Sequence, residues 1–274
     1  FSRSTFRNCF DNGYDKTYSQ VVRRYVDNGT GKQNSELISQ IYNVLREGYR
    51  NEYYYKNTLL NKLLLGIHSV NTTTALTEIP IAKSKADFVL INGKAVVYEI
   101  KTELDNFDRL ENQINDYYKA FDHVAVVTCK ENLQVLKKKI EMIGKPVGIY
   151  ILQKRGTITT IQKPQAYSVE LDAEILFKIL RKQEYEEILF NKYKHLPDVS
   201  EFKYYSECKK MFLEIPLEEA YLSVLKLLKK RSQIIKDEFS KIPYELKFLA
   251  YFMNLKSDDY KKITKFLNES YGGV

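Results

Sequence analysis

The sequence has no tryptophan, and among its 274 residues it has only three cysteines, three histidines and six prolines. Cys9, Cys129 and Cys208 lie far apart and form no Cys-x-x-Cys pair, so neither a zinc knuckle nor a redox motif is predicted. Isolated thiols of this kind are typical of a reducing cytosol. The histidines are equally scattered, so a histidine-based nuclease or zinc hydrolase is not predicted either.

Long hydrophobic runs are also absent. No stretch approaches the ~18 apolar residues that a membrane-spanning helix needs, and the first ten residues contain no secretory apolar core. We therefore expect a cytoplasmic protein without a membrane partner. Hydrophobic residues still make up 44% of the chain, enough for a substantial core in one large domain or two small ones.

The charge is basic and unevenly distributed. The net charge is +8, and residues 1–164 hold 24 Lys and Arg against 17 Asp and Glu, whereas residues 165–274 hold 19 against 18. A basic excess favours a polyanionic partner such as nucleic acid. Some of the 22 tyrosines could stack on bases, although a core or interface role explains them equally well.

Two β-rich runs, residues 86–91 and 95–100, flank the dipeptide Asn92-Gly93. Asn-Gly between hydrophobic runs is the strongest short-range signal for a hairpin, here with a type I′ turn and positive φ at both residues. Asp87 and Glu99 then lie near the open end of the hairpin. Because strand side chains alternate, Glu99 and Lys101 share one face. Paired carboxylates beside a lysine suit metal-assisted hydrolysis of a phosphodiester, although polar residues also end many solvent-facing strands.

A helix is predicted from Asn106 to Phe121, with Asp105 as its N-cap. Gln113 and Tyr117 are four residues apart and therefore share one face of this helix.

Asp87, the hairpin and Glu99-Ile100-Lys101 resemble the signature of the PD-(D/E)xK nuclease superfamily. Gln113 and Tyr117 match the Gln-x-x-x-Tyr element of its RecB-like branch. The resemblance covers residues 36–152, and it extends to a poorly characterised group of bacterial nuclease-like proteins. Ala86 stands where the proline of the family name would precede Asp87.

The resemblance implies a divalent-metal-dependent nuclease using Mg²⁺, with Mn²⁺ as a substitute. The metal ligands would be Asp87, Glu99, the carbonyl of Ile100 and, from an upstream helix, Glu52. Glu78 would contact one of these ligands without binding the metal itself, or it would lie on the surface.

The other implied roles concern water and nucleic acid. Lys101 would orient the attacking water and stabilise charge on the phosphate, so Asp87, Glu99 and Lys101 form the catalytic set. Gln113 and Tyr117 would help to hold the nucleic acid.

The pattern predicts an α/β fold with a mixed central sheet, arranged as the restriction-endonuclease-like core, and a C-terminal all-helical subdomain. Residues 1–33 form an N-terminal extension, 34–164 the nuclease-like domain and 165–274 a helical domain of five or six helices. The predicted elements are helices at 17–28, 35–50, 52–67 and 131–141, a helix at 218–230, and strands at 74–80, 85–91, 95–102, 124–128, 147–152 and 156–161.

Three functions remain open. The first is a nuclease, with the Gln113–Tyr117 match favouring DNA. The second is a catalytically inactive scaffold that binds nucleic acid or protein, with the helical domain as a surface for a partner protein. The third is a toxin or phage-defence nuclease acting on RNA.

Overall fold

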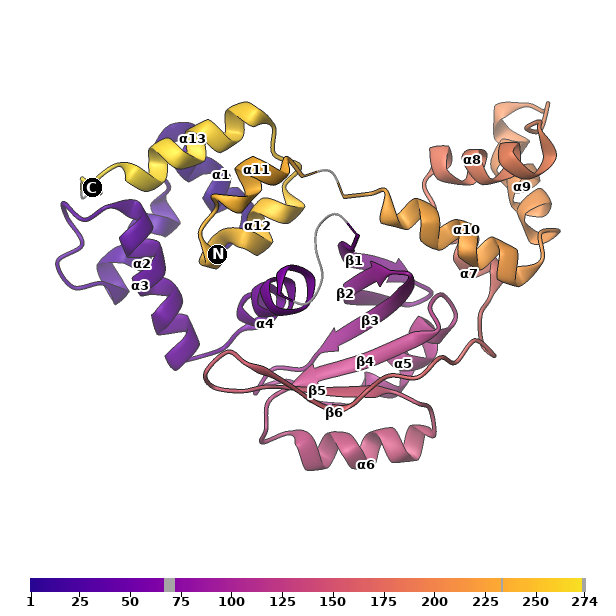
Figure 1. The fold of residues 1–274 in the computed structure, drawn as a ribbon, viewed down its shortest axis with the longest axis horizontal. Helices are drawn as coiled ribbons and strands as arrows, with labels where there is room; N and C mark the ends of the chain where they lie inside the picture. The colour runs from indigo at the N-terminus through magenta and orange to yellow at the C-terminus, as the bar shows by residue number, and fades with distance from the viewer. Residues whose placement is uncertain (67–71, 233, 273–274) are drawn as a thin grey trace. The chain divides into compact units, whose positions relative to one another are not determined.

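The computed structural model describes residues 1–66, 72–232 and 234–272 (Figure 1). Within it the chain forms two compact units. One comprises residues 71–153 and 158–231, and the other comprises residues 1–70, 154–157 and 232–274. Among the described residues, no helix combines the length and the apolar character needed to cross a membrane.

The first unit is built on a six-stranded mixed sheet, in which the strands follow one another in chain order from β1 to β6. Strands β1–β2, β2–β3 and β5–β6 pair antiparallel, whereas β3–β4 and β4–β5 pair parallel. The strands are β1 (Thr74–Ile81), β2 (Ser84–Asn92), β3 (Lys94–Ile100), β4 (His123–Thr128), β5 (Gly148–Leu152) and β6 (Ile158–Gln162).

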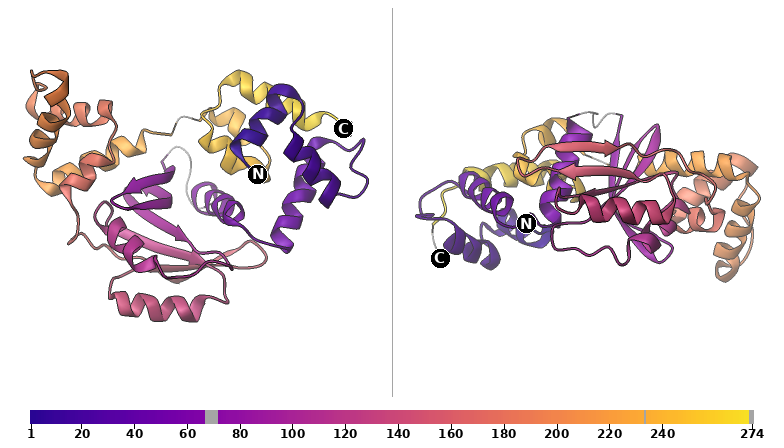
Figure 2. Two further views of the ribbon diagram at one scale, coloured as in Figure 1. Left: turned by 180° about the vertical axis from the view of Figure 1, so that it is seen from behind. Right: turned by 90° about the horizontal axis from the view of Figure 1, so that it is seen from below.

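Helices α5 (Leu110–Tyr118) and α6 (Leu133–Ile143) make the crossovers between the parallel strands. Strand β4 is buried along its whole length, as expected for the near-continuous apolar run of a central parallel strand. Leu136 and Ile140 of α6 pack in the same core as Val124 and Val126 of β4. Figures 1 and 2 show α6 lying along this sheet. The sequence prediction of an α/β fold with a mixed sheet is confirmed.

Four helices that follow the sheet complete this unit: α7 (Ala173–Lys178), α8 (Lys182–Tyr193), α9 (Glu201–Leu213) and α10 (Leu217–Lys229). Leu176, Leu189, Phe212 and Val224 belong to the same core cluster as the sheet residues. The helix predicted at residues 218–230 is α10, which buries Ala220, Tyr221, Val224, Leu225, Leu227 and Leu228.

The second unit is helical and is built from segments near both ends of the described chain. It contains α1 (Arg3–Asn12), α2 (Lys16–Tyr25), α3 (Asn34–Glu47), α4 (Glu52–Leu59), a π-helix η1 (Leu60–Leu65), α11 (Lys236–Ser240), a 3₁₀ helix η2 (Tyr244–Leu246), α12 (Lys247–Phe252) and α13 (Ser257–Asn268).

Two buried asparagines tie the early helices to the late ones. The Asn34 amide donates to the carbonyls of Phe266 (3.0 Å) and Glu269 (3.1 Å). Asn57 donates to the carbonyl of Tyr244 and accepts from the amide of Phe248, both at 3.0 Å. Because a buried amide left unpaired is costly, these contacts fix the pairing of the segments.

The limits of the two compact units differ from the domain boundaries that the sequence predicted. Residues 34–66 belong to the helical unit, and the predicted helical domain is divided at residue 231. The helices of 165–231 share the core of the sheet, and those after 232 pack with the N-terminal helices. Helical periodicity reveals an apolar face and does not reveal which surface covers it, so the sequence could not predict this division.

The predicted hairpin at Asn92-Gly93 is present, but its turn differs from the prediction. Asn92 pairs with Lys94, and Gly93 alone of the dipeptide has a positive φ, of 72°. The predicted N-cap is also wrong. The N-cap of α5 is Arg109, and Asp105 precedes the helix by several residues.

Helix α5 is anchored to the sheet through Asp116. Its carboxylate accepts from the Lys83 amide (3.2 Å) and the Ser84 hydroxyl (2.8 Å) at the β1–β2 turn, and from Lys119 (2.9 Å). Burial alone would raise the pKa of Asp116, but the hydrogen bonds from Lys119 and Ser84 outweigh it, and the pKa lies below its ordinary value. The charged carboxylate therefore stabilises the fold.

We expect Asp116→Asn to lower the free energy of unfolding at pH 7 by about 1–3 kcal/mol, because a charge-assisted acceptor is lost. A lowered folded-state pKa gives stability that is complete above the unfolded value of about 3.9 and is lost as the pH falls through the folded value. Urea unfolding from pH 7 to pH 2.5 should therefore show the difference between wild type and variant closing in acid.

The control is Asp108→Asn, which changes an exposed carboxylate in the same unit. It should alter stability by less than about 0.5 kcal/mol. A stability difference for Asp116→Asn that persists unchanged in acid would contradict the anchoring role of the charge.

Candidate functional site

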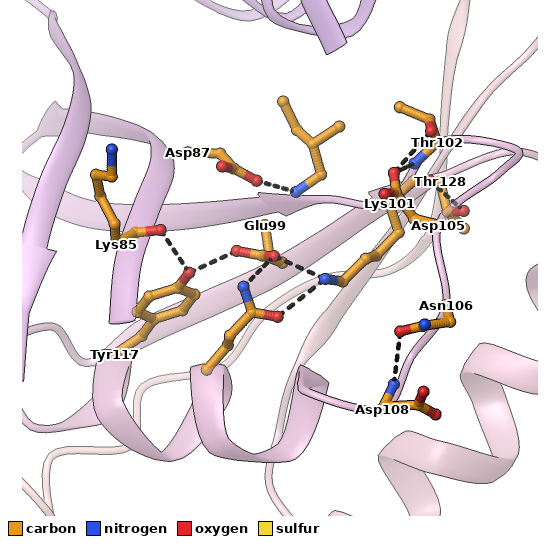
Figure 3. Close-up of polar contacts among 12 residues, drawn as sticks. Lys85, Asp87, Glu99, Lys101, Thr102, Asp105, Asn106, Asp108, Tyr117 and Thr128 are labelled. Atoms are coloured by element: carbon orange, nitrogen blue, oxygen red, sulfur yellow. Dashed lines mark hydrogen bonds and ion pairs between the residues drawn. The ribbon is translucent and has the colours of Figure 1, made fainter. Parts of the chain in front are cut away.

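Asp87 lies in β2 just beyond the last paired residues of the hairpin, Phe88 and Tyr98. One carboxylate oxygen of Asp87 accepts from the amide of Ile100 (2.9 Å), in the place of a backbone partner from the neighbouring strand (Figure 3). Its carbonyl accepts from the Thr77 hydroxyl of β1 (2.7 Å). Asp87 is therefore held from both neighbouring strands at the open end of the hairpin.

Glu78 in β1 has a left-handed backbone, with a φ of 57°. This conformation is uncommon for a residue with a side chain, and such residues concentrate at functional sites. Thr77 pairs with Phe88 and Ile79 pairs with Ala86, so Glu78 of β1 lies opposite Asp87 of β2. A carboxylate oxygen of Glu78 lies within 4.8 Å of one from Asp87, and Lys85 forms an ion pair with Glu78 at 2.7 Å.

Glu99 and Lys101 form a buried ion pair at 3.0 Å, with 2% and 7% of the two residues exposed. The backbone amide of Lys101 donates to the carbonyl of Val127 (2.9 Å), which continues the β3–β4 ladder by one residue. The two side chains therefore point the same way, as the period of a strand requires.

Helix α5 closes a network around this ion pair. The Gln113 amide donates to Glu99 (2.6 Å), and its oxygen accepts from the Lys101 ammonium (2.9 Å). The Tyr117 hydroxyl donates to the second oxygen of Glu99 (2.5 Å) and lies 2.9 Å from the Lys85 carbonyl. Figure 3 shows Glu99 between Tyr117 and Lys101. Because a hydroxyl has one proton, Tyr117 can donate fully to only one of these two acceptors.

Burial dominates the electrostatics of the network. It raises the pKa of Glu99 above the ordinary value, while Lys101, Tyr117 and Gln113 oppose the increase. Burial and the neighbouring carboxylate of Glu99 also raise the pKa of Tyr117, so the phenol stays protonated. A carboxyl group with a raised pKa and a fixed cation is typical of a functional site, and also of a structural ion pair.

The chain beyond Lys101 is held by polar contacts. The carbonyl of Lys101 accepts from the Thr128 hydroxyl (2.6 Å), and the carbonyl of Thr102 accepts from the Asn132 amide (3.1 Å). Asp105 accepts from both the amide and the hydroxyl of Thr102, each at 2.7 Å. Lys101 is therefore fixed by its backbone as well as by its ammonium group.

Glu52 belongs to the helical unit, and its role as a metal ligand stays a prediction. It is the first residue of α4 in the helical unit, where its exposed side chain forms an ion pair with Lys56 at 2.6 Å. The sheet unit itself brings together the other site residues predicted from the sequence: Glu78, Asp87, Glu99, Ile100, Lys101, Gln113 and Tyr117.

Sequence reasoning missed the residues that support the site. Asp116 anchors the helix that carries Gln113 and Tyr117, and Thr128 and Asn132 hold the chain around Lys101. One signal was available, since Asp105 stands three residues after Thr102, a spacing at which a carboxylate caps a turn. The contacts of Thr128 and Asn132 are long-range and left no local pattern.

The fold and the site define an α/β protein with a buried acid–lysine–amide–phenol network at one edge of a mixed sheet. The family model described as bacteriophage P4 protein cII matches residues 46–248, about three quarters of the chain. The chain belongs to this family.

Protein cII of Enterobacteria phage P4 is 24% identical to this chain over 143 residues. The alignment covers 50% of this chain and 49% of that protein, so the chain matches about half the length of this relative. No solved structure matches the chain.

We expect the Glu99–Lys101 pair to show strong energetic coupling. Lys101→Met leaves a buried carboxylate without its cation and should lower the free energy of unfolding by about 3–5 kcal/mol. Adding Glu99→Gln should recover part of that loss, so a double-mutant cycle measured by urea unfolding should give a coupling of about 1–3 kcal/mol.

The matched control is the pair Lys192–Glu219, which has a shorter separation of 2.7 Å but is partly exposed in the same unit. Its cycle, with Lys192→Met and Glu219→Gln, should give less than about 1 kcal/mol. Equal coupling in the two cycles would contradict the role assigned to burial.

Proposed function

We propose that this protein is a divalent-metal-dependent nuclease that hydrolyses phosphodiester bonds of DNA, with a restriction-endonuclease-like core. The observation that carries the proposal is the convergence of Glu99, Lys101, Gln113 and Tyr117 on one buried network, next to the strand that holds Asp87. The choice of DNA rests on the Gln-x-x-x-Tyr resemblance.

The topology supports this assignment. Three antiparallel strands are followed by a helix and a parallel strand, and the carboxylates and the lysine lie where the hairpin opens. This is the order expected for the PD-(D/E)xK core. The upstream helix predicted to belong to that core lies in the other compact unit, so the support concerns the strands and α5.

The donors present fit a hard divalent cation. Oxygens of Asp87 and Glu78 lie within 4.8 Å of each other, and an ion with Mg–O distances of about 2.1 Å could contact both after a small side-chain movement. Glu99 accepts from Gln113 and Lys101 on one oxygen and from Tyr117 on the other, so its second oxygen keeps one acceptor position that could reach the ion. A bound Mg²⁺ would lower the pKa of a water molecule and offset charge on the phosphate.

The remaining roles follow from position. Lys101 has the cation that could orient the attacking water or contact the phosphate. Both polar atoms of Gln113 are engaged by Glu99 and Lys101, and Tyr117 is fully buried. These contacts favour positioning of the acid and the lysine, in place of the nucleic-acid contacts that the resemblance implies for Gln113 and Tyr117.

A second candidate is the catalytically inactive scaffold. The observation that favours it is the closure of the network, because both oxygens of Glu99 already have donors from the protein. In that case the ion pair serves the fold, and nucleic acid would bind without a metal requirement.

We expect Asp87→Asn, Glu99→Gln and Lys101→Met each to lower Mg²⁺-dependent cleavage of DNA by about 100-fold or more, since each removes a ligand or a transition-state contact. The assay uses linear and circular DNA, single strands and RNA, with Mg²⁺, Mn²⁺ or EDTA. Asp108→Asn and Lys137→Met, which change exposed residues, should cleave like the wild type.

The same panel separates the candidates. Binding of nucleic acid without cleavage, and a melting temperature that neither Mg²⁺ nor Mn²⁺ changes, would support the scaffold. If the protein cleaves RNA and leaves DNA intact, the proposed DNA substrate is wrong and the protein is an RNA nuclease.

We expect Tyr117→Phe to lower kcat by about 10-fold and to leave KM and the Kd for DNA nearly unchanged, because the phenol orients Glu99 and is shielded from solvent. The checks are steady-state kinetics and fluorescence anisotropy in EDTA. If Tyr117 instead contacts the nucleic acid, the Kd will rise and kcat at saturation will change little.

A further inference from the structure

The basic excess of the chain lies in the helical unit. That unit, which comprises residues 1–70, 154–157 and 232–274, holds 19 Lys and Arg against 12 Asp and Glu, a net charge of +7. The sheet unit, which carries Asp87, Glu99 and Lys101, holds 24 against 23, a net charge of +1. Because phosphate contacts supply most of the non-specific affinity for nucleic acid, this division points to the helical unit as the source of that affinity.

Within the helical unit, helix α2 gathers cations on one face. The helix contains no Asp or Glu, and its buried residues include Tyr18 and Val22. Tyr18 donates to the side chain of Asn34 on α3 (2.8 Å), so the packing of α2 fixes which face meets solvent. Four exposed residues recur at helical spacing on the opposite face: Lys16, Gln20, Arg23 and Arg24.

The stability of the helix explains only some of these cations. Arg23 and Arg24 lie in the last turn, where the helix dipole favours positive charge. Lys16 is the first residue of the helix, where the dipole disfavours a cation, and the first turn has no acidic residue. Among the described residues, Lys16 and Arg24 form no ion pair, and the Arg24 guanidinium lies over the ring of Tyr25 at 5.3 Å. The fold itself therefore makes little use of these two charges.

Nearby carboxylates do not cancel the charge of this face. Asp15, the N-cap of α2, accepts from the Tyr18 amide and from the Asn8 side chain, each at 3.0 Å. Its negative charge is therefore engaged by the first turn of α2 and by α1. Asp27 follows the helix, but residues 16–32 hold four Lys and Arg against this one Asp. The segment keeps a local charge of +3.

The length of the face suits the spacing of phosphates. Lys16 and Arg24 are eight residues apart, which is about 12 Å along a helix. One strand of DNA rises by about 3.4 Å per nucleotide, so this length corresponds to three or four phosphates. Contacts to phosphates carry no sequence information, and the face is therefore suited to holding DNA of any sequence.

Resting on the proposed nuclease function for the choice of DNA, we infer that the exposed face of α2 binds the phosphate backbone. The helical unit then provides the affinity that the nearly neutral sheet unit lacks, and the sheet unit provides the chemistry. Because both units belong to one chain, DNA held by α2 stays at a high local concentration for the site. Removal of the cations should therefore weaken binding and raise KM, and kcat at saturation should change little.

The test replaces the three cations of α2 together: Lys16→Gln, Arg23→Gln and Arg24→Gln. The matched control removes three exposed cations of the sheet unit: Lys137→Gln, Lys138→Gln and Lys203→Gln. Binding to a labelled DNA duplex is measured by anisotropy in EDTA, from about 50 to 200 mM KCl. The α2 variant should bind about 10-fold more weakly or worse at the lower salt concentration, and the slope of log K against log salt should fall by about 2–3. The control should keep the slope of the wild type.

A second variant separates charge from folding. Arg23→Lys combined with Arg24→Lys keeps the charge of the face and should keep the salt slope of the wild type, whereas a structural role of the arginines would lower affinity here too. Equal losses in the α2 variant and the sheet-unit control, or binding by the α2 variant at the level of the wild type, would overturn the inference. Loss of binding to phosphatidylserine vesicles with unchanged binding to DNA would assign the face to lipid and also overturn it.

Cleavage distinguishes this inference from the proposed function. With Mg²⁺, the α2 variant should raise KM by about 10-fold and leave kcat nearly unchanged. Asp87→Asn should show the reverse, with cleavage lost and the Kd in EDTA kept. If no form of the protein cleaves DNA but binding depends on α2, the nuclease proposal fails and the binding face stands. If the wild type cleaves DNA and the α2 variant has the same KM and Kd, the nuclease proposal stands and the binding face is wrong.

Discussion

The buried ion pair between Glu99 and Lys101 sets the main constraint on the sheet unit. Two charges removed from water are tolerated only when their attraction and further hydrogen bonds offset the cost of desolvation. Gln113 and Tyr117 provide those hydrogen bonds, so helix α5 must lie at a fixed height against β3. The Asp116 contacts at the β1–β2 turn hold the same helix at a second point. The position of α5 therefore follows from polar contacts as well as from its apolar face.

The same network connects stability with the proposed chemistry. Three protein donors stabilise the Glu99 carboxylate and leave one of its about four acceptor positions open. Asp87 and Glu78 differ from it, since they are less buried and their oxygens approach each other within 4.8 Å. Under the proposed function, Asp87 and Glu78 would hold a divalent ion that activates water, and Glu99 and Gln113 would keep the Lys101 ammonium in place beside it.

Much of the sheet could be predicted from the sequence. Alternation and the Asn92-Gly93 dipeptide predicted the β2–β3 hairpin, and the apolar run of residues 124–128 predicted a buried strand; both are confirmed. Gln113 and Tyr117 were predicted to share a face from their spacing, and they do face one network. These successes share a cause, because strand and helix periods are local properties of the chain.

The chain by itself determined its α/β class, its strand segments and the hairpin that brings Asp87 near Glu99 and Lys101, since each depends on side-chain period and on one turn. Only the tertiary structure decided three further features. It placed Glu78 beside Asp87 through a left-handed residue, and it placed Glu52 in the helical unit. It also divided the C-terminal helices between two cores. These features depend on contacts between residues far apart in the sequence, where an apolar face or a carboxylate has many candidate partners and packing selects one.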